Sequence, residues 1–227
     1  MKIIIESLIR KIKKRKFQFD KDISVGDIFR LVMVNGIALM RGAVFYRKVL
    51  ALGKGVEIYR INNCEIGKGV SIASYSILDF LGREQSRIGN GSSVGRFSLI
   101  KVSGSFSDLG KQIDIGNNVG LGDFSHIGGA GGVKIGDDTI VGAYFSVHPE
   151  NHIFISNEKL IRQQGVTHKG IVIGKNCWIG AKVTVLDGTN VGDGCVIAAG
   201  AVLTGKSFPD NSIIAGVPAK IIGSRNE

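Results

Sequence analysis

The strongest constraint in this sequence is a period of six residues. Residues 173–220 divide into eight consecutive blocks, IGKNCW IGAKVT VLDGTN VGDGCV IAAGAV LTGKSF PDNSII AGVPAK, of which the first six begin with Ile, Val or Leu. Blocks of the same kind begin earlier in the chain at Ile66, Ile88, Ile115 and Ile135. A period of six fits neither the 3.6-residue period of a helix nor the alternation of a simple strand.

This period predicts an all-β fold, a left-handed parallel β-helix of hexapeptide repeats. Each block supplies a short strand and a turn, three blocks close one triangular coil, and coils stack at about 4.8 Å. The aliphatic residue at position one fills the interior, position five is small, and glycine at position two permits the turn conformation. The left-handed coil is an exception to the usual right-handed crossover. We expect this domain to span residues 58–222 and to be followed by a C-terminal tail, residues 223–227.

The three cysteines are expected to pack in the core. Cys177 and Cys195 fall at position five of their blocks, and Cys64 does so when the blocks are extended backward from Ile66. Their spacing matches no zinc pattern, and the sequence predicts neither a disulfide nor a thiol nucleophile.

Residues 1–57 are expected to form a basic helical segment. Residues 1–60 contain 14 basic and five acidic residues, which gives +9 of the formal net charge of +10. The run RKIKKRK, residues 10–16, could attract nucleic acid, anionic lipid or a phosphorylated carrier. Since neither a nucleic-acid recognition motif nor interleaved aromatic residues accompany the run, we expect no nucleic-acid partner.

An apolar stretch, residues 28–45, follows the basic run. Ser24 and Asp27 resemble a capping box and predict a helix that begins there. Arg30, Asn35 and Arg41 make membrane insertion costly. The favoured interpretation is a helix packed on its own domain or on a neighbouring subunit, and the alternative is a helix at a membrane surface.

The opening MKIIIESLI is short for a signal peptide, is interrupted by Glu6 and lacks a small-residue cleavage site. We therefore expect a cytoplasmic protein, with a peripheral position at the inner face of the membrane as a variant. The open ends of the β-helix need caps, and the N-terminal helix and residues 221–227 are the candidates.

The repeat is interrupted at residues 78–87, at 100–114 and, for longest, between Val147 and Ile173. The third interruption contains HPENHIFISNEKLIRQQGVTHKG and predicts a loop over residues 148–170. Long ordered loops on rigid scaffolds are where binding and catalysis usually occur.

From this loop onward the sequence resembles a known family. HPENH, followed by RQQGVTHKGIVIGKNCWIGAKVTVLDGT, VIAAGAVLTG and IIAGVPAKII, is similar to the hexapeptide-repeat acyltransferases. The likeness is strongest to maltose and galactoside O-acetyltransferases and to the O-acetyltransferases of bacterial surface polysaccharides. The resemblance covers about residues 60–224 and is specific over residues 147–222. It implies a homotrimer with active sites between neighbouring coils, acetyl-CoA as co-substrate, a saccharide acceptor and no metal.

In that family a loop histidine acts as general base on the acceptor. Imidazole suits the task because a sugar hydroxyl is a poor nucleophile and an unperturbed histidine titrates near pH 6.5. The resemblance favours His152 as the base over His148. Glu150 or Asn151 would orient the base or bind the acceptor.

The two remaining histidines are not expected to act as the base. His126 is expected at a turn or the surface, with a place beside a neighbouring subunit's loop as the alternative, and His168 is expected to be a loop residue.

The resemblance also implies residues that bind acetyl-CoA. Trp178, the only tryptophan, would pack beside the pantetheine arm. The alternative is that Trp178 makes a contact between subunits of the trimer. The other implied contacts are backbone groups at Gly180, Ala181 and Ala199 for the pantetheine amides, and Thr204, Lys206 and Lys220 for the nucleotide end. Lys206 departs from the family pattern because Gly205 separates it from Thr204.

The sequence thus predicts an O-acetyltransferase acting on a sugar hydroxyl of a surface polysaccharide, a lipopolysaccharide or a precursor. An N-acetyltransferase of amino sugars or nucleotide sugars is the nearest alternative. Two others are a metal enzyme similar to γ-class carbonic anhydrases, which would use His126, His148 and His152, and an assembly module without catalysis.

Overall fold

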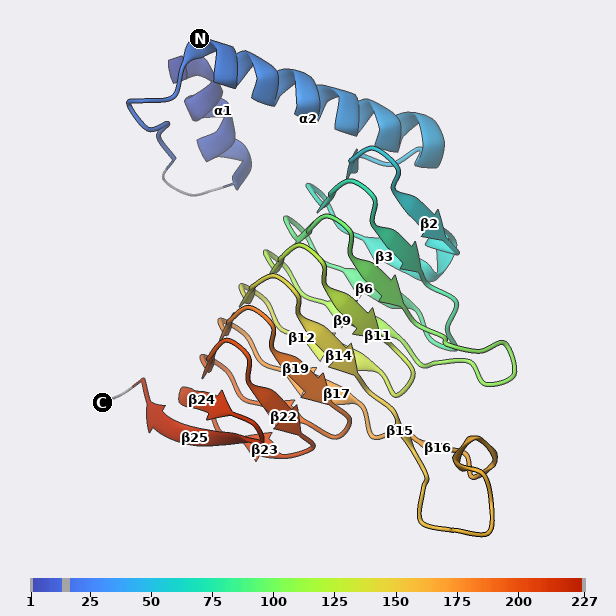
Figure 1. Cartoon of the computed structure of the whole chain (residues 1–227). Helices are drawn as coiled ribbons and strands as arrows, with labels where there is room; N and C mark the ends of the chain where they lie inside the picture. Colours follow the sequence, from blue (N-terminus) through green and yellow to red (C-terminus); the bar gives the residue numbers. More distant parts are fainter. Residues whose placement is uncertain (1, 14–16, 226–227) are drawn as a thin grey trace. The chain divides into compact units, whose positions relative to one another are not determined.

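The chain forms two compact units, Met1–Leu52 and Gly53–Glu227. The computed structural model (Figure 1) describes residues 2–13 and 17–225. The end of the basic run, residues 14–16, and the last two residues of the predicted tail lie outside these ranges.

The first unit contains α1 (Lys2–Lys13), α2 (Val25–Tyr46) and β1 (Ala51–Leu52). The predicted capping box at the start of α2 is confirmed: Ser24 Oγ accepts the Asp27 N–H at 3.1 Å, and the Asp27 carboxylate accepts the Ser24 N–H at 3.1 Å. Near the end of α2, a Cβ on Gly42 would lie 1.9 Å from the Leu50 carbonyl oxygen. Glycine is therefore required where the chain folds back on the helix.

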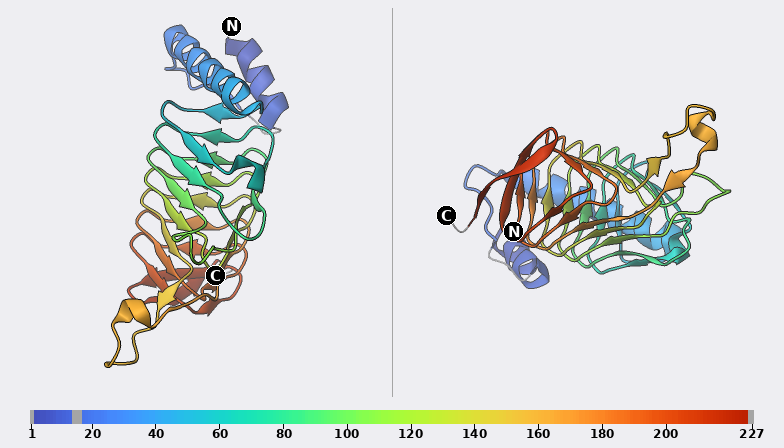
Figure 2. Two further views of the ribbon diagram at one scale, coloured as in Figure 1. Left: turned by 90° about the vertical axis from the view of Figure 1, so that its right-hand side faces the viewer. Right: turned by 90° about the horizontal axis from the view of Figure 1, so that it is seen from below.

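The second unit is a triangular coil with three parallel sheets (Figures 1 and 2). Within this unit sheet 1 consists of β4 (Ser71–Ile72), β7 (Ser93–Val94), β10 (Gly120–Leu121), β13 (Ile140–Val141), β18 (Trp178–Ile179), β21 (Val196–Ile197), β24 (Ser212–Gly216) and β25 (Ala219–Ser224). Sheet 2 consists of β2 (Glu57–Tyr59), β5 (Ile77–Asp79), β8 (Leu99–Lys101), β11 (His126–Gly128), β14 (Ser146–His148), β19 (Thr184–Leu186) and β22 (Val202–Thr204). Sheet 3 consists of β3 (Cys64–Ile66), β6 (Ser86–Ile88), β9 (Ile113–Ile115), β12 (Val133–Ile135), β17 (Ile171–Ile173), β20 (Asn190–Val191) and β23 (Ser207–Phe208). A short 3₁₀ helix, η1 (Ile61–Asn63), precedes β3.

The interior is built as the six-residue period predicts. Most of the aliphatic residues that open the blocks are buried, among them Ile88, Ile115, Ile135 and Ile173, whereas Ile66 is half-buried. All three cysteines are buried, which confirms their assignment to the core. Burial raises the pKa of the Cys177 thiol to about 11 and raises that of Cys195, so neither thiol is a nucleophile at neutral pH.

Asparagine and aspartate side chains stitch successive coils together at the corner between sheets 3 and 1. In each case a side-chain oxygen accepts the backbone N–H of the equivalent residue in the preceding coil, at 2.7–2.9 Å. The acceptors are Asn90, Asn117, Asp137, Asp193 and Asp210. Four of them occupy the third position of their blocks and Asp210 the second position of PDNSII, so the sequence contained this signal although the period alone does not reveal it.

The C-terminal segment forms an antiparallel hairpin. β25 pairs with β24, with Ala215 opposite Lys220, and continues to Ser224. The strand thus extends into the expected tail and gives the last strand of sheet 1 a hydrogen-bonding partner.

Replacement of Asp137 by alanine tests the coil-to-coil hydrogen bonds. The Asn117 N–H would lose its acceptor, and we expect the free energy of unfolding, measured by urea titration at pH 7, to fall by about 1–3 kcal/mol. The hydrogen bond from Asn117 is the main cause of a lowered Asp137 pKa. The contribution of the Asp137 carboxylate to stability is therefore fully present at pH values above its ordinary pKa of 3.8. It is lost as the pH falls through the lowered pKa of the folded state.

Lys175 is the matched control, because it occupies the same block position and its exposed side chain accepts no such bond. Lys175→Ala should change stability by less than about 0.5 kcal/mol. Equal losses in the two variants would contradict the proposed role of the carboxylate.

Candidate functional site

The interruptions of the repeat all leave the coil at one corner. Residues 80–85, 102–112 and 149–170 each connect a strand of sheet 2 to the next strand of sheet 3. The second and third of these segments project on the same side of the coil in the right-hand view of Figure 2. The sequence located the three interruptions but could not show that they share a corner.

The longest insertion folds on itself. β15 (Asn151–His152) and β16 (Val166–Thr167) form an antiparallel pair, and a 3₁₀ helix, η2 (Ile161–Gln163), lies between them. This hairpin extends the loop away from the coil (Figure 1).

Asp187 fixes the base of this loop. Its carboxylate accepts the N–H of Lys169 at 2.9 Å and that of Gly170 at 2.8 Å, and the Asn151 amide lies 3.5 Å away. The side chain is almost fully buried. Sequence reasoning missed Asp187; its signal is an acidic residue in VLDGTN, a block without the usual glycine at position two.

Two imidazoles meet on the outer face of sheet 2. His148 ends β14 and its Nε2 lies 2.6 Å from Ser146 Oγ. The ring of His126, on the adjacent strand β11, lies 5.2 Å from the ring of His148. Burial, and secondarily the neighbouring His148, lowers the pKa of His126, which therefore remains neutral at physiological pH.

The other loop residues selected from the sequence are arranged differently. His152 is exposed on the hairpin, where its backbone pairs with Val166. The carboxylate of Glu150 lies 3.6 Å from Nε2 of His168. His168 also lies 3.9 Å from Asp108, which in turn pairs with Arg83 at 3.1 Å.

These contacts join residues from all three insertions into one charged chain. Exposed pairs of this kind contribute little stability, but they show that the insertions abut one another above the corner.

The residues expected to bind acetyl-CoA lie on both sides of sheet 2. Trp178 is exposed on β18 of sheet 1, and Gly180 and Ala181 follow it at the corner between sheets 1 and 2. Ala199 occupies that corner one coil later, with its backbone N 2.5 Å from where a Cβ on Gly180 would lie. A side chain at position 180 would therefore collide with the next coil, and glycine is required there.

The three residues expected at the nucleotide end lie elsewhere in the coil. Thr204 ends β22, and Lys206 is exposed in the turn that leads to sheet 3, at the corner from which the insertions leave. Lys220 is exposed on β25. One chain therefore distributes the predicted residues over two corners and the terminal hairpin.

Four aromatic rings stack along the corner between sheets 1 and 2. The rings of Tyr75, Phe97, Phe124 and Tyr144 are 4.9–5.4 Å apart, centre to centre, and within 13° of parallel. Each residue has a positive φ of 54–61° and leaves about half of its side chain exposed. We call these residues the aromatic ladder; the sequence analysis did not identify it.

No group of three or more histidine, cysteine or acidic side chains able to hold a metal occurs among the described residues. His126 and His148 are close, but His152 does not join them in a ligand set. The arrangement required by the carbonic-anhydrase-like alternative is therefore not assembled by this chain.

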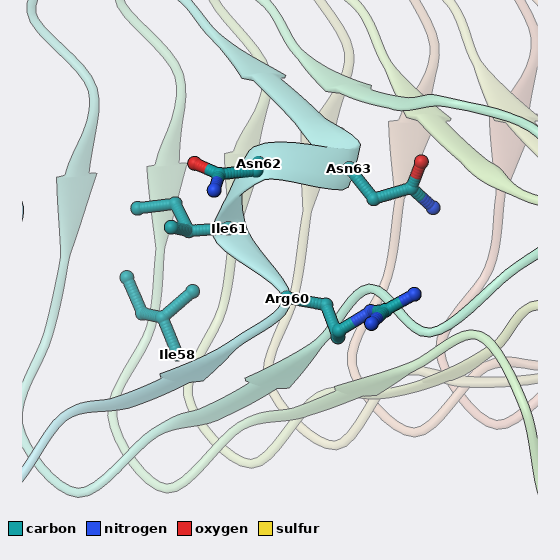
Figure 3. Close-up of a pocket in the computed structure, with 5 residues that line it drawn as sticks. All are labelled: Ile58, Arg60, Ile61, Asn62 and Asn63. Carbon is teal, nitrogen blue, oxygen red and sulfur yellow. The ribbon is translucent and has the colours of Figure 1, made fainter.

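Two hollows of the described surface have no histidine in their lining. One, of about 510 Å³, is lined by Ile58, Arg60, Ile61, Asn62 and Asn63 in the first coil (Figure 3). There Asn63 donates to the Phe80 carbonyl at 2.9 Å, which indicates a structural role. Another, of about 420 Å³, lies at sheet 3 and includes Lys111, Lys134 and Lys169.

The Asp187→Ala variant tests how the loop is held. Lys169 and Gly170 would lose their common acceptor, and we expect amide hydrogen exchange over residues 149–170 to accelerate by about tenfold or more. Asp123→Ala is the control, because Asp123 accepts a backbone N–H from Arg96 at 2.7 Å at another corner. Unchanged exchange in the loop would show that Asp187 does not anchor it.

Comparison with known proteins bears on the fold and the family. The family model described as "Bacterial transferase hexapeptide (six repeats)" matches residues 170–205. The chain is 36% identical over 117 residues to a putative lipopolysaccharide biosynthesis O-acetyl transferase, WbbJ, of Escherichia coli K12, a match that covers 48% of this chain and 59% of that protein. It is 33% identical over 99 residues to the galactoside O-acetyltransferase of the same strain, covering 42% of this chain and 45% of that protein. A probable acetyltransferase of Mycobacterium tuberculosis is 30% identical over 202 residues, covering 87% of this chain and 55% of that protein.

The chain thus spans about half the length of the curated relatives it matches. Among solved structures, an N-acyltransferase from Bacillus cereus, AntD, in complex with dTDP-4-amino-4,6-dideoxyglucose and coenzyme A, superposes with a TM-score of 0.53 at 19% identity. That match covers 78% of this chain and 81% of the other. These matches confirm the left-handed β-helix and the resemblance to the hexapeptide-repeat acyltransferases.

Proposed function

From its relationship to the hexapeptide-repeat acyltransferases, we propose that this chain transfers an acetyl group from acetyl-CoA to a saccharide hydroxyl. The observation that supports this function best is the imidazole pair on sheet 2, which lies at the base of an anchored loop. The similarity to a putative lipopolysaccharide biosynthesis O-acetyl transferase favours a surface polysaccharide or its precursor as acceptor. A cytoplasmic location is part of the same proposal.

We assign the general base to His148 in preference to His152. A base must be held within hydrogen-bonding reach of the proton it removes, and small displacements cost rate. His148 ends a paired strand and contacts Ser146, whereas His152 is exposed on the hairpin. In the tautomer in which Nε2 of His148 donates to Ser146, Nδ1 has no proton and can accept one from the substrate.

The reaction then needs no covalent enzyme intermediate. The acceptor oxygen attacks the thioester carbonyl carbon and forms the new C–O bond, while its proton passes to His148. The C–S bond then breaks, and the proton on His148 neutralises the departing CoA thiolate. His126, neutral because its pKa is lowered, adds no second positive charge beside the imidazolium that forms at His148.

We propose a homotrimer in which sheet 2 of one subunit faces sheet 1 of its neighbour. The split between His148 on sheet 2 and Trp178 on sheet 1 supports this arrangement, because facing copies would bring the two together. The exposed aromatic ladder lies at the corner between these sheets and would be covered near the threefold axis. Glu150, Asn151 and Lys220 keep their predicted roles at the acceptor and the nucleotide end.

Replacement of His148 tests the assignment of the base. We expect His148→Ala to lower the rate of CoA thiol release from acetyl-CoA, measured with a panel of sugars, by about 10² to 10⁴. His152→Ala is the matched control and should remain within a few-fold of the wild type. The opposite pattern would transfer the role to His152, and amino sugars in the panel distinguish the N-acetyl alternative.

Replacement of Phe124 tests the trimer. Phe124→Glu places a charge in the middle of the aromatic ladder, and we expect light scattering to show a smaller species with reduced activity. Phe106→Glu, on an exposed loop, is the control for the same chemical change. A wild-type chain that is monomeric yet fully active would contradict the shared site.

A further inference from the structure

The helix α2 exposes an apolar surface that the proposed activity does not explain. Phe29, Met33, Ile37, Met40 and Val44 follow one another at helical spacing and form one face, which we call the outer stripe. Each of these side chains is between 39% and 67% exposed. The buried residues of α2 lie on the opposite face and are Ile28, Ala38 and Gly42.

Apolar exposure continues beyond the outer stripe. The further large apolar side chains exposed on α2 are Val25, Leu31, Val32, Val34, Leu39 and Phe45. Within the described residues, α2 is also the helix that is long and apolar enough to cross a membrane. An apolar surface of this extent is rare on soluble proteins and indicates a binding surface.

The polar groups of α2 are placed where a bilayer tolerates them. By helical spacing Arg30 and Arg41 flank the outer stripe on one side. Arg30 is exposed and its long side chain can reach lipid headgroups, whereas the guanidinium of Arg41 donates to the Leu52 carbonyl at 3.3 Å. The amide of Asn35 donates to the Leu31 carbonyl at 2.7 Å and is thus satisfied within the helix. Asp27, the one acidic residue of α2, is bound to the cap residue Ser24.

The charge of the N-terminal segment indicates which partner the apolar surface of α2 binds, a second copy of the chain or a lipid bilayer. With 14 basic and five acidic residues, residues 1–60 would repel the same segment of a second copy but attract an anionic surface.

We propose that α2 docks on an anionic lipid bilayer and lies in the interfacial plane with the outer stripe in the acyl region. An orientation across the bilayer is disfavoured because Arg30, Asn35 and Arg41 would then lie at membrane depth. This docking concerns the first unit and does not depend on acetyl transfer.

Vesicle sedimentation of the full-length chain tests the docking. We expect binding to vesicles of phosphatidylcholine with about one third phosphatidylglycerol, weaker binding to phosphatidylcholine alone, and a decrease as salt is raised. Met33→Glu combined with Met40→Glu should lower the partition coefficient at least about tenfold. The control, Phe106→Glu, places one glutamate at a side chain that is 91% exposed in the second unit and should bind as the wild type.

Circular dichroism melting of each variant establishes that the coil remains folded. Binding of the double variant equal to that of the wild type, or equal binding to both vesicle types at all salt concentrations, would overturn the proposal. So would light scattering that shows a smaller assembly for the double variant together with no vesicle binding by the wild type, since the occupant would then be a second copy.

Discussion

The structure depends on the pairing of each coil with the next at a fixed register. Gly120 pairs with Ile140, and Trp178 pairs with both Ile140 and Val196, so a residue's place in its block determines its face and its height. Aliphatic side chains fill the interior of every coil. At the turns between sheets 3 and 1, Asn and Asp side chains accept hydrogen bonds from backbone N–H groups. A slip of one residue would turn the buried aliphatic columns outward, so the register is strongly specified.

The same register explains which features could be read from the sequence. Position one of each block predicts a buried residue, and position five places the three cysteines inside. The period gives no starting point for a coil, so it could not show that the three insertions share a corner or that Asp187 lies below the third. The aromatic ladder could not be predicted from the sequence for a similar reason. Phe97 and Phe124 are 27 residues apart because an insertion separates them, and their rings stack only once the coil has closed.

The two candidate bases beside the long loop are held differently. His152 is closer in sequence to Ile171, where the coil resumes, but residues 151–167 form a hairpin that carries it outward. His148 precedes the hairpin and therefore keeps the rigidity of its strand. The N-terminal helix shows the complementary case, because its cap was readable from Ser24 and Asp27 while the exposure of its outer stripe depended on packing that no local pattern encodes.

The placement of His148 also indicates what a single chain lacks. The imidazole lies on the outer face of a sheet, and neither of the hollows described above includes it. Thioester chemistry in water competes with hydrolysis, and closing the site strengthens its electrostatic interactions. One wall is provided by the insertions, joined through His168 and anchored by Asp187. In the proposed trimer the opposite wall comes from the exposed Trp178 face of a second copy, which carries residues expected to bind the donor.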